Sequence, residues 1–417
     1  MDRKIKLLVI PSDYSGCGYY RSTNPHLHLQ EMYPDEFDVD IVYLKDIPTN
    51  DTEKFFKQYD LIHIHKMLDK NLMLMNMIKF LGIPVIVDVD DAYKLGDHHP
   101  MSISAQREKW HEPIVAHLRA ADYVSTTTDI YAKKLLKHNK NVLVFPNAID
   151  PNDGQCNTTK NPNPSGRLRV GIICGSSHLR DLEILRGVSS RVPIDKVQFL
   201  LCGFDTNGTR TIYHQDTGQV ERRNILPKES VWYEYEKIVT DNYKIVSPEH
   251  KEFLMQFMAG VDDPFTNEPY RRMWTRNINK YRTHFDNVDV LLAPLDTNDF
   301  NAAKSQLKET ECAFTHTAFI AQNFGAYTID LTNMMEKGGK INEDATAILI
   351  DPAKNHKNWA KAITLLANRP DLVTKLQDNL YKFGTETYHI DKICAERAEA
   401  YRKIVAESVA KRENAST

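Results

Sequence analysis

The sequence predicts an α/β protein built from two domains, each with a parallel β-sheet. The chain has 417 residues, enough to bury two ordinary hydrophobic cores. Apolar runs alternate with longer amphipathic stretches in both halves, and these runs are continuous, as in strands covered on both faces. Residues 150–167 are rich in Asn, Pro, Gly and Ser, and the strand pattern restarts after them. We therefore predict two Rossmann-like domains facing across a cleft, residues 1–150 and 168–384, with a linker at 151–167.

The first domain is expected to contain six parallel strands. Helical patterns such as 106–121 and 130–138 separate the apolar runs, which favours crossover connections. The expected strands are residues 5–11, 39–44, 61–65, 84–88, 123–126 and 142–146.

The second domain is organised around residues 286–327. This segment predicts a strand at 288–294, a polar loop, an amphipathic helix beginning near Asn301, a strand at 317–322 and a glycine loop. Residues 205–285 are expected to be a polar, aromatic-rich insertion. The helical pattern of residues 385–417 indicates C-terminal helices that can return to the first domain.

Composition indicates a soluble globular protein, with 41% hydrophobic and 26% charged residues. There is no apolar run of about 18 residues that would predict a membrane span. The apolar run in MDRKIKLLVIP is too short for a signal peptide, so a cytoplasmic location is expected. The six cysteines form no C-x-x-C pair and are expected to be reduced thiols. A net charge of −3 gives no overall attraction to nucleic acid.

The expected helix of the central segment carries a charged face. Lys304, Lys308 and Glu311 are spaced i, i+4 and i+7, so they share one side of a helix near its N-terminus, where phosphate binds best. A solvated charged face is the alternative interpretation.

In each domain, one glycine loop follows the first expected strand. In the first loop, Gly16 and Gly18 permit close backbone approach and Arg21 offers paired donors to an anion, although an ordinary strand-to-helix turn remains the alternative. The second loop is an anion-site candidate because it puts backbone N–H groups and hydroxyls before a helix. Its residues are Gly175, Ser176, Ser177 and His178.

An acidic stretch follows the fourth expected strand. Asp88, Asp90 and Asp91 repel one another unless a metal or a basic side chain offsets their charge. We expect Asp90 or Asp91 to contact a ligand, with His98 or His99 nearby; the alternative is a helix N-cap followed by solvated acids. His63 and His65 share one strand face and are interpreted as satisfied histidines rather than metal ligands.

The central segment resembles the nucleotide-sugar-binding core of retaining glycosyltransferases of the GT-B fold, the family 4 or group 1 type. The helix pattern K-x-x-E and the following strand and loop are in register at Lys308, Glu311, Ala321, Gly325 and Tyr327. The loop G-S-S-H-x-x-D-L at 175–182, the first glycine loop and the acidic stretch are also similar to GT-B segments.

Three positions depart from that family pattern. His316 replaces the usual glycine, Ala318 the usual proline, and Ala303 the first of two glutamates spaced eight positions apart. The last departure leaves nucleotide binding in place and puts the identity of the sugar in doubt.

The resemblance implies a glycosyltransferase that moves a sugar from a nucleoside-diphosphate sugar, with UDP as the candidate nucleotide, to a hydroxyl acceptor with retention. No cofactor is expected, and a divalent metal is not expected to be essential. Glu311 would bind the ribose, while Lys304, Lys308 and the 175–178 loop would neutralise the diphosphate. The opposite wall would be lined by the first glycine loop with Arg21, and by Asp90 and Asp91. Asp90 or Asp91 would contact the acceptor or the donor sugar. Expected catalytic residues are Asp90, Asp91, His98 and Lys308, and further donor contacts are Asn301 and Ser305.

Two alternatives and the acceptor stay open. One alternative is a sugar-nucleotide epimerase of GT-B-like fold, and the other is a non-catalytic nucleotide-sugar-binding protein. The acceptor is a glycan, a lipid-linked sugar, a protein or a hydroxylated nucleobase. An aromatic, arginine-bearing stretch could stack on sugars or bases, although packing is the favoured interpretation. Its residues are Tyr270, Arg271, Arg272, Trp274 and Arg276.

Overall fold

The computed structural model describes residues 3–66, 72–97, 99–214, 216–352 and 356–416. The chain divides into two compact units. Unit 1 comprises Met1–Asp153, Asn298–Thr310 and Gly384–Thr417, and unit 2 comprises Gly154–Thr297 and Glu311–Phe383. Each unit contains a six-stranded sheet in which all paired strands are parallel. The predicted fold class of two parallel α/β halves is therefore confirmed.

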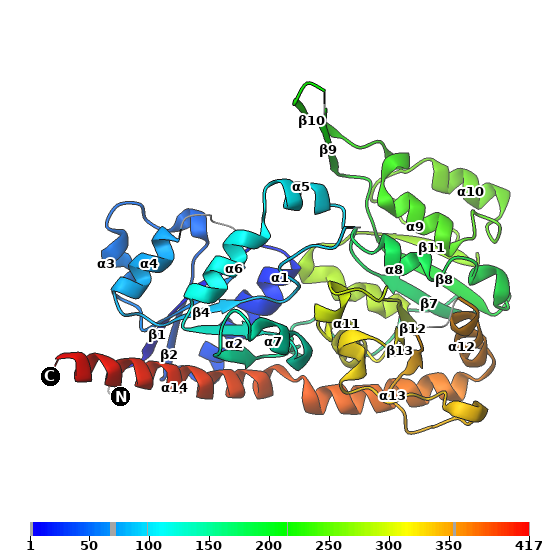
Figure 1. Ribbon diagram of the computed structural model, residues 1–417. Coiled ribbons are helices and arrows are strands. Elements are labelled where there is room, and N and C mark those ends of the chain that lie inside the picture. Colours follow the sequence, from blue (N-terminus) through cyan, green and yellow to red (C-terminus); the bar gives the residue numbers. More distant parts are fainter. Residues whose placement is uncertain (1–2, 67–71, 98, 215, 353–355, 417) are drawn as a thin grey trace. The chain divides into compact units, whose positions relative to one another are not determined.

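The sheet of unit 1 has the strand order β2-β1-β3-β4-β5-β6 (Figure 1). Two of its strands have the predicted bounds, and β2 begins earlier because the buried Phe37 pairs with Ile5. The strands are β1 (Ile5–Ile10), β2 (Phe37–Ile41), β3 (Leu61–His65), β4 (Val85–Asp88), β5 (Tyr123–Thr126) and β6 (Val142–Val144).

Helices of unit 1 connect these strands. The helix expected at 106–121 is interrupted at Lys109, whose φ of 55° ends α5 (Ser102–Arg107) before α6 (His111–Ala120) begins. The other helices are α1 (Gly16–Gly18), which continues as a π-helical turn at Tyr19–Thr23, α2 (Asn24–Met32), α3 (Thr52–Phe56), α4 (Met73–Phe80), α7 (Asp129–Leu135) and α14 (Ile390–Ser416).

Two apolar layers cover the two faces of this sheet. Alternate residues of β1 point to opposite faces: Leu8 and Ile10 pack with α4, α6 and α7, whereas Leu7 and Val9 pack with α2 and α14. The C-terminal helix α14 contributes one side of the second layer, from Ile390 to Val405. Residues 384–417 thus complete the core of unit 1.

The sheet of unit 2 has the order β11-β8-β7-β12-β13-β14. Its edge strand β11 pairs in parallel with β8, so residues 205–285 add a strand to this sheet instead of forming only an insertion outside it. The strands are β7 (Leu168–Ile173), β8 (Val197–Phe204), β11 (Tyr270–Trp274), β12 (Val290–Ala293), β13 (Ala318–Gln322) and β14 (Ile348–Ile350).

Between β8 and β11 the chain forms a hairpin and two helices. The hairpin of β9 (Thr209–Tyr213) and β10 (Val220–Asn224) extends away from the sheet (Figure 1). The packing interpretation is confirmed for Tyr270, which is buried in the core of unit 2, and for Trp274, which packs partly buried against that core. Trp232 and Tyr235 are buried in the same core. The helices of the unit are α8 (Leu179–Glu183), α9 (Val231–Val239), α10 (Pro248–Met255), α12 (His356–Asn368) and most of α13 (Pro370–Thr387).

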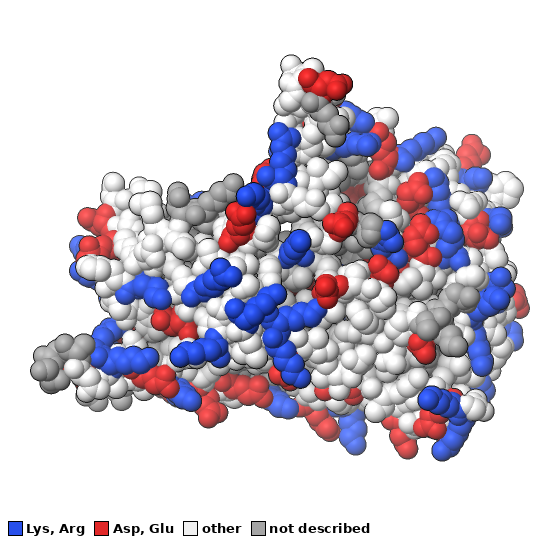
Figure 2. All heavy atoms as spheres, viewed as in Figure 1, with Lys and Arg blue, Asp and Glu red and all other residues white. Residues whose placement is uncertain are grey.

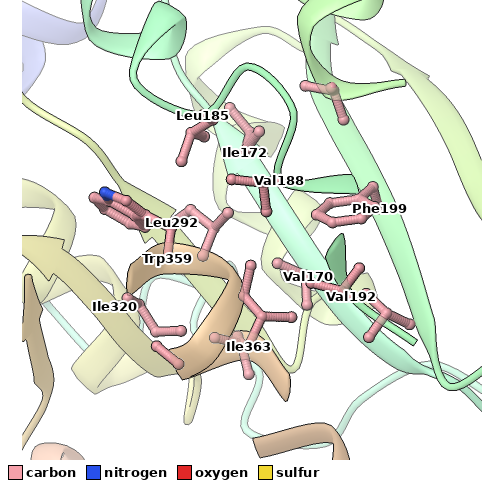
Figure 3. Packing of buried hydrophobic residues seen from close by; sticks show 14 of the residues in the cluster. Val170, Ile172, Leu185, Val188, Val192, Phe199, Leu292, Ile320, Trp359 and Ile363 are labelled. Atoms are coloured by element: carbon pink, nitrogen blue, oxygen red, sulfur yellow. The ribbon is translucent and has the colours of Figure 1, made fainter. Parts of the chain in front are cut away.

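Figure 3 shows how this core closes against α12. Trp359 and Ile363 of the helix lie beside Ile320 and Leu292 of two sheet strands, and Val170 lies behind them. Burying aromatic and branched side chains of this size contributes about 1.5–3 kcal/mol each relative to exposure. This hydrophobic core holds in place the strands whose ends carry the loops of the candidate site.

The predicted linker is held against unit 2 by a buried lysine. The Lys160 ammonium group donates to Phe285 O at 3.0 Å, Thr315 O at 2.8 Å and Thr317 Oγ1 at 2.6 Å. Burial lowers the pKa of Lys160 to about 8. The second half of the linker is consequently part of the packed unit.

The helix expected to begin near Asn301 is broken in two. A 3₁₀ turn at Asn301–Ala303 ends at Lys304, whose ψ of 160° is extended, and α11 begins only at Leu307 (Leu307–Phe314). Lys304 therefore does not share a helix face with Lys308 and Glu311, contrary to the sequence-based expectation. The whole of 298–310 also groups with unit 1 rather than with the unit that follows the linker.

No helix among the described residues is both long and apolar enough to cross a membrane. None of the six cysteines forms a disulfide within the described part of the chain.

Candidate functional site

The carboxyl ends of the strands in unit 1 bring the acidic stretch and the first glycine loop together. Because β1, β3 and β4 are parallel neighbours, the loops after Ile10, His65 and Asp88 emerge from one edge of the sheet. This edge is where ligands bind in open α/β sheets.

The first acid of the stretch is neutralised inside the protein. Arg21 donates to Asp88 with Nε at 2.9 Å and Nη2 at 2.7 Å, and both side chains are buried. Burial alone would raise the pKa of Asp88, but the charge and hydrogen bonds of Arg21 outweigh it and lower that pKa. Nη1 of Arg21 is bound to Phe145 O and Asn147 Oδ1. Arg21 is thus a support beneath the site, which corrects its assignment as a donor-binding residue.

The second acid is paired with a lysine that sequence reasoning missed. Asp90 lies 2.5 Å from the Lys66 ammonium and 3.3 Å from His65 Nε2. Burial would raise the pKa of Asp90, but Lys66 and His65 lower it well below its usual range. His65 also contacts Ser12 Oγ through Nδ1 at 2.9 Å. The Lys66 ammonium, just after β3, provides a counter-charge to Asp90.

Asp91 faces a cavity of about 1150 Å³ whose described lining comes entirely from unit 1. The strand ends form its floor, and α5, α6 and Phe300 supply further lining. Of the acidic stretch, only Asp91 is among the described lining residues, whereas Asp88 and Asp90 are buried. Asp91 can therefore contact a ligand, whereas Asp88 and Asp90 stabilise the loops.

The first glycine loop is built around Asp13. Its Oδ1 accepts the N–H groups of Ser15 at 2.8 Å and Gly18 at 3.2 Å. A Cβ on Gly18 would lie 1.9 Å from Asp13 O, so only glycine fits there. Gly16 opens the short helix α1 in the same loop. The glycines therefore shape the loop that carries Ser12 and Asp13 into the cavity wall.

The histidines of the region have different environments. His98 lies outside the described residues, while His99 lines the cavity with its ring 5.6 Å from that of Phe300. Burial, and then the nearby charge of Lys304, lower the pKa of His99. Burial lowers the pKa of His63 to about 3, so this histidine is neutral near pH 7. His63 and His65 are both buried. The interpretation as satisfied histidines holds for His65, which has hydrogen-bond partners, but is wrong for His63, whose two ring nitrogens have none among the described residues.

Four donor-site candidates, Asn301, Lys304, Ser305 and Lys308, lie in the 298–310 segment of unit 1. Asn301 is buried, and its N–H donates to Asn298 Oδ1 at 2.9 Å. Ser305 Oγ accepts from Asn147 Nδ2 at 3.0 Å, while the Lys304 ammonium lies 5.4 Å from the centre of the Phe300 ring. Asn147 also accepts a hydrogen bond from Arg21, so it connects this segment to Arg21.

The second glycine loop is fixed by Asp181 and Tyr235. His178 Nδ1 lies 2.7 Å from Asp181 Oδ2, and the His178 N–H donates to the Tyr235 hydroxyl at 2.8 Å. Asp181 Oδ1 accepts the backbone N–H of Asp296 at 2.8 Å, in the loop after β12. The loops after the neighbouring strands β7 and β12 are thereby joined at one carboxyl edge of sheet 2.

Gly175 and Ser176 remain exposed beside this joint, and Ser177 is half-buried. A Cβ on Gly175 would meet nothing within 4 Å, so the surface above this residue is open. Backbone N–H groups and two hydroxyls here offer donors to an anion.

Lys308 and Glu311 are three residues apart on α11, as the pattern required, but their burial differs from expectation. Lys308 is half-buried, whereas Glu311 is fully buried. The expectation that neither residue would be a core position is therefore wrong for Glu311. A buried carboxylate requires partners, so Glu311 combines a structural role with any role in binding.

No protein-family model matches the chain, and no curated protein matches it by sequence. Solved structures do match. Anabaena HepE, solved in complex with UDP and glucose, matches with a TM-score of 0.60 and 11% identity over 96% of this chain and 100% of the other. A glycosyltransferase from Rickettsia africae has a TM-score of 0.60 and 12% identity, over 96% of this chain and 99% of the other.

An enzyme described as a putative UDP-N-acetylglucosamine 2-epimerase from Listeria monocytogenes also matches, with a TM-score of 0.51 and 10% identity over 97% of both chains. At such identities the likeness shows the fold alone. The chain has the GT-B fold of glycosyltransferases, which confirms the resemblance at the level of fold.

Proposed function

We propose that the protein is a glycosyltransferase that moves a sugar from a nucleoside-diphosphate sugar to a hydroxyl acceptor with retention. The observation that carries the proposal is the joint made by Asp181 between the loops after β7 and β12. It presents exposed donors at the carboxyl edge of sheet 2, in a fold shared over nearly the whole chain with a structure that holds UDP and glucose.

The proposal assigns a role to each candidate residue. Gly175, Ser176, Ser177 and His178, with Lys304 and Lys308, neutralise the diphosphate as it leaves, and Glu311 accepts from the ribose hydroxyls. Further donor contacts are assigned to Asn301 and Ser305.

In the reaction, the acceptor oxygen bonds to the anomeric carbon, the bond from that carbon to the β-phosphate oxygen breaks, and the hydroxyl proton passes to the β-phosphate of the leaving nucleoside diphosphate. Asp91 orients the acceptor hydroxyl from the cavity of unit 1. Asp90 positions Lys66 and His65 and does not itself reach the acceptor.

The first experiment incubates the protein with a panel of nucleotide sugars, including UDP-glucose, and measures free nucleotide. Slow release without an acceptor, unchanged by EDTA, is the expected result. Loss of turnover in EDTA that manganese or magnesium restores would instead assign the acidic stretch to a metal. Binding of every nucleotide sugar without turnover would favour a non-catalytic binding protein.

Calorimetric titration with UDP tests the nucleotide site. Lys308→Ala is expected to lower kcat/KM by about 2–4 kcal/mol in transition-state stabilisation and to weaken UDP binding, because a charge-assisted contact is lost. Lys340→Ala, at an exposed lysine, serves as the matched control. If Lys308→Ala and Glu311→Gln both bind UDP with wild-type affinity, the nucleotide does not bind at α11. Thermal unfolding of Glu311→Gln separates the structural role of this buried residue from binding.

The epimerase remains a second candidate because a structure of that description shares the fold over the whole chain. Epimerisation moves a proton at the sugar ring and needs no acceptor. Conversion of UDP-N-acetylglucosamine to an isomer, followed by NMR, would favour it over transfer.

A further inference from the structure

We propose that the acceptor is an uncharged sugar linked to a flat apolar group, and that the cavity of unit 1 binds that group. This inference rests on the proposed transferase function and specifies its acceptor. Apolar and aromatic side chains from four parts of unit 1 line the cavity, among them Leu44, Tyr93, Met101, Trp110, Ile114 and Phe300.

The rings that line the cavity are held in place before any ligand binds. Trp110 Nε1 donates to Glu108 at 2.8 Å, and Tyr93 is held through its hydroxyl, 3.0 Å from His138 Nε2. The ring of Phe300 is fixed between His99 and the Lys304 ammonium. Pre-ordered rings bind a planar apolar group with little loss of side-chain entropy.

Two large apolar side chains at the cavity are also unusually exposed. Leu44 is 43% and Met101 45% exposed, and both are lining residues. An apolar ligand group would remove this surface from water, which favours its binding.

The charges around the cavity disfavour a phosphate-bearing acceptor. The described lining includes the carboxylates of Asp13, Asp91 and Asp97 and the ammonium groups of Lys66 and Lys94, and Lys66 is held by Asp90. The hydrogen bonds to Asp13 lower its pKa despite its partial burial, so this carboxylate is ionised near pH 7.

Exposed lysines on α7 and just after it lie elsewhere in the unit. Lys133, Lys137 and Lys140 are exposed, and none of the three lines the cavity. Figure 2 shows Lys and Arg gathered on the viewed face over α6 and α7. Lipid diphosphates and nucleic acid are therefore poor matches for the cavity. An aryl glycoside, with its hydroxyls toward Asp91, is the better match.

Calorimetric titration without a donor tests the cavity directly. The probes are phenyl glycosides of glucose, galactose, mannose and N-acetylglucosamine, each compared with the free sugar and the sugar 1-phosphate. At least one phenyl glycoside is expected to bind about tenfold or more tightly than its free sugar, and the 1-phosphates no more tightly than the free sugars. Tighter binding of a 1-phosphate, or no binding of any phenyl glycoside, overturns the inference.

Matched methionine variants locate the binding. Met101→Ala and Trp110→Ala are expected to weaken binding of the phenyl glycoside by about tenfold, whereas Met73→Ala should leave it unchanged. Met73 is 76% exposed on α4 and is not among the cavity residues. Equal effects of Met101→Ala and Met73→Ala, or no effect of Met101→Ala, would overturn the assignment. Met101 is exposed, so its variant tests the idea even if Trp110→Ala folds poorly.

Transfer assays separate this inference from the proposed function. The phenyl glycosides are offered as acceptors with every nucleotide sugar that releases nucleotide. Nucleotide release with a preference for phosphate-bearing acceptors would support the proposed transferase function but contradict the proposed acceptor class. Absence of nucleotide release from all donors would remove the transferase, while the titrations would still decide what the cavity binds.

Discussion

Two buried arginine–carboxylate pairs, one in each unit, have nearly the same geometry and different positions. Arg21 holds Asp88 at 2.9 and 2.7 Å in unit 1, and Arg272 holds Glu236 at 2.9 and 2.6 Å in unit 2. Both pairs are bidentate, and all four side chains are buried. The geometry of a buried arginine–carboxylate pair therefore does not show whether the pair supports a binding site or only stabilises the fold.

The surroundings of the pairs make the difference. Glu236 also accepts from the hydroxyls of Tyr243 and Tyr270, so its pair lies among packed aromatic residues where β11 meets α9. Asp88 ends β4, three positions before the cavity residue Asp91, and accepts from Ser125 Oγ at 2.6 Å. One pair secures an edge strand, and the other sets the loops of the candidate site.

The largest expected effect comes from removing each arginine. Arg21→Met and Arg272→Met should each lower the free energy of unfolding by about 3–5 kcal/mol, because a buried carboxylate is left uncompensated. Only Arg21→Met should also alter acceptor binding in the protein that remains folded. Urea denaturation and titration with a phenyl glycoside measure the two effects.

Arg186→Met removes an exposed pair with Glu183 and serves as the control, with an expected loss below about 1 kcal/mol. A loss in Arg272→Met no larger than in this control would contradict the structural role of the unit 2 pair.

A smaller effect is expected where the unit 1 charges reach the cavity. Asp90→Asn should cost about 1.5–3 kcal/mol in unfolding free energy, because the Lys66 ammonium loses its carboxylate. Asp91→Asn should change stability by no more than about 0.5 kcal/mol and should reduce transfer instead. The reverse ranking in thermal and kinetic measurements would exchange the roles of the two residues.

Acid should weaken unit 1 through Asp88 and Asp90. Their folded pKa values are lowered from the model-peptide value of 3.8, so the stability they contribute is present above that pH and is lost as the pH falls through the folded values. Urea midpoints between pH 6 and about pH 2 should show this loss, and Asp88→Asn should make the pH profile flatter. An unchanged profile in that variant would show that other carboxylates dominate.

The smallest effect is expected from reductant. The cysteines form no disulfide among the described residues, and the negative charge of Asp90, together with burial, raises the pKa of Cys17, which keeps this thiol protonated. Thermal midpoints and turnover should be equal with and without reductant. A drop in the midpoint on reduction would reveal a disulfide.

Much of the fold could be predicted because strand periodicity is local. Residues 61–65 and 123–126 have the predicted bounds, and the predicted parallel sheets are present. The edge strand β11 was missed because its sequence, YRRMW, places an arginine at a buried position. Only the distant Glu236 makes that position acceptable, and such a partner cannot be seen from the segment itself.

The candidate site shows the same limit. The need for a counter-charge to the acidic stretch could be predicted, but not that Arg21 and Lys66 supply it, because Arg21 comes from the turn at Tyr19–Thr23 and Lys66 from the end of β3. The break at Lys304 was hidden because its residue types suit a helix. Glu311 has the spacing of an exposed charged residue, and only tertiary packing shows that it is buried.

The return of the chain to unit 1 has a consequence for synthesis on the ribosome. The sheet of unit 1 is complete at β6, yet one of its faces is covered by α14, which the ribosome makes only after nearly all of unit 2. At about 5–20 residues per second, Leu7, Val9 and Phe37 wait on the order of ten seconds or more for Tyr401 and its neighbours. During that interval the nascent chain carries an apolar sheet face that chaperones can recognise.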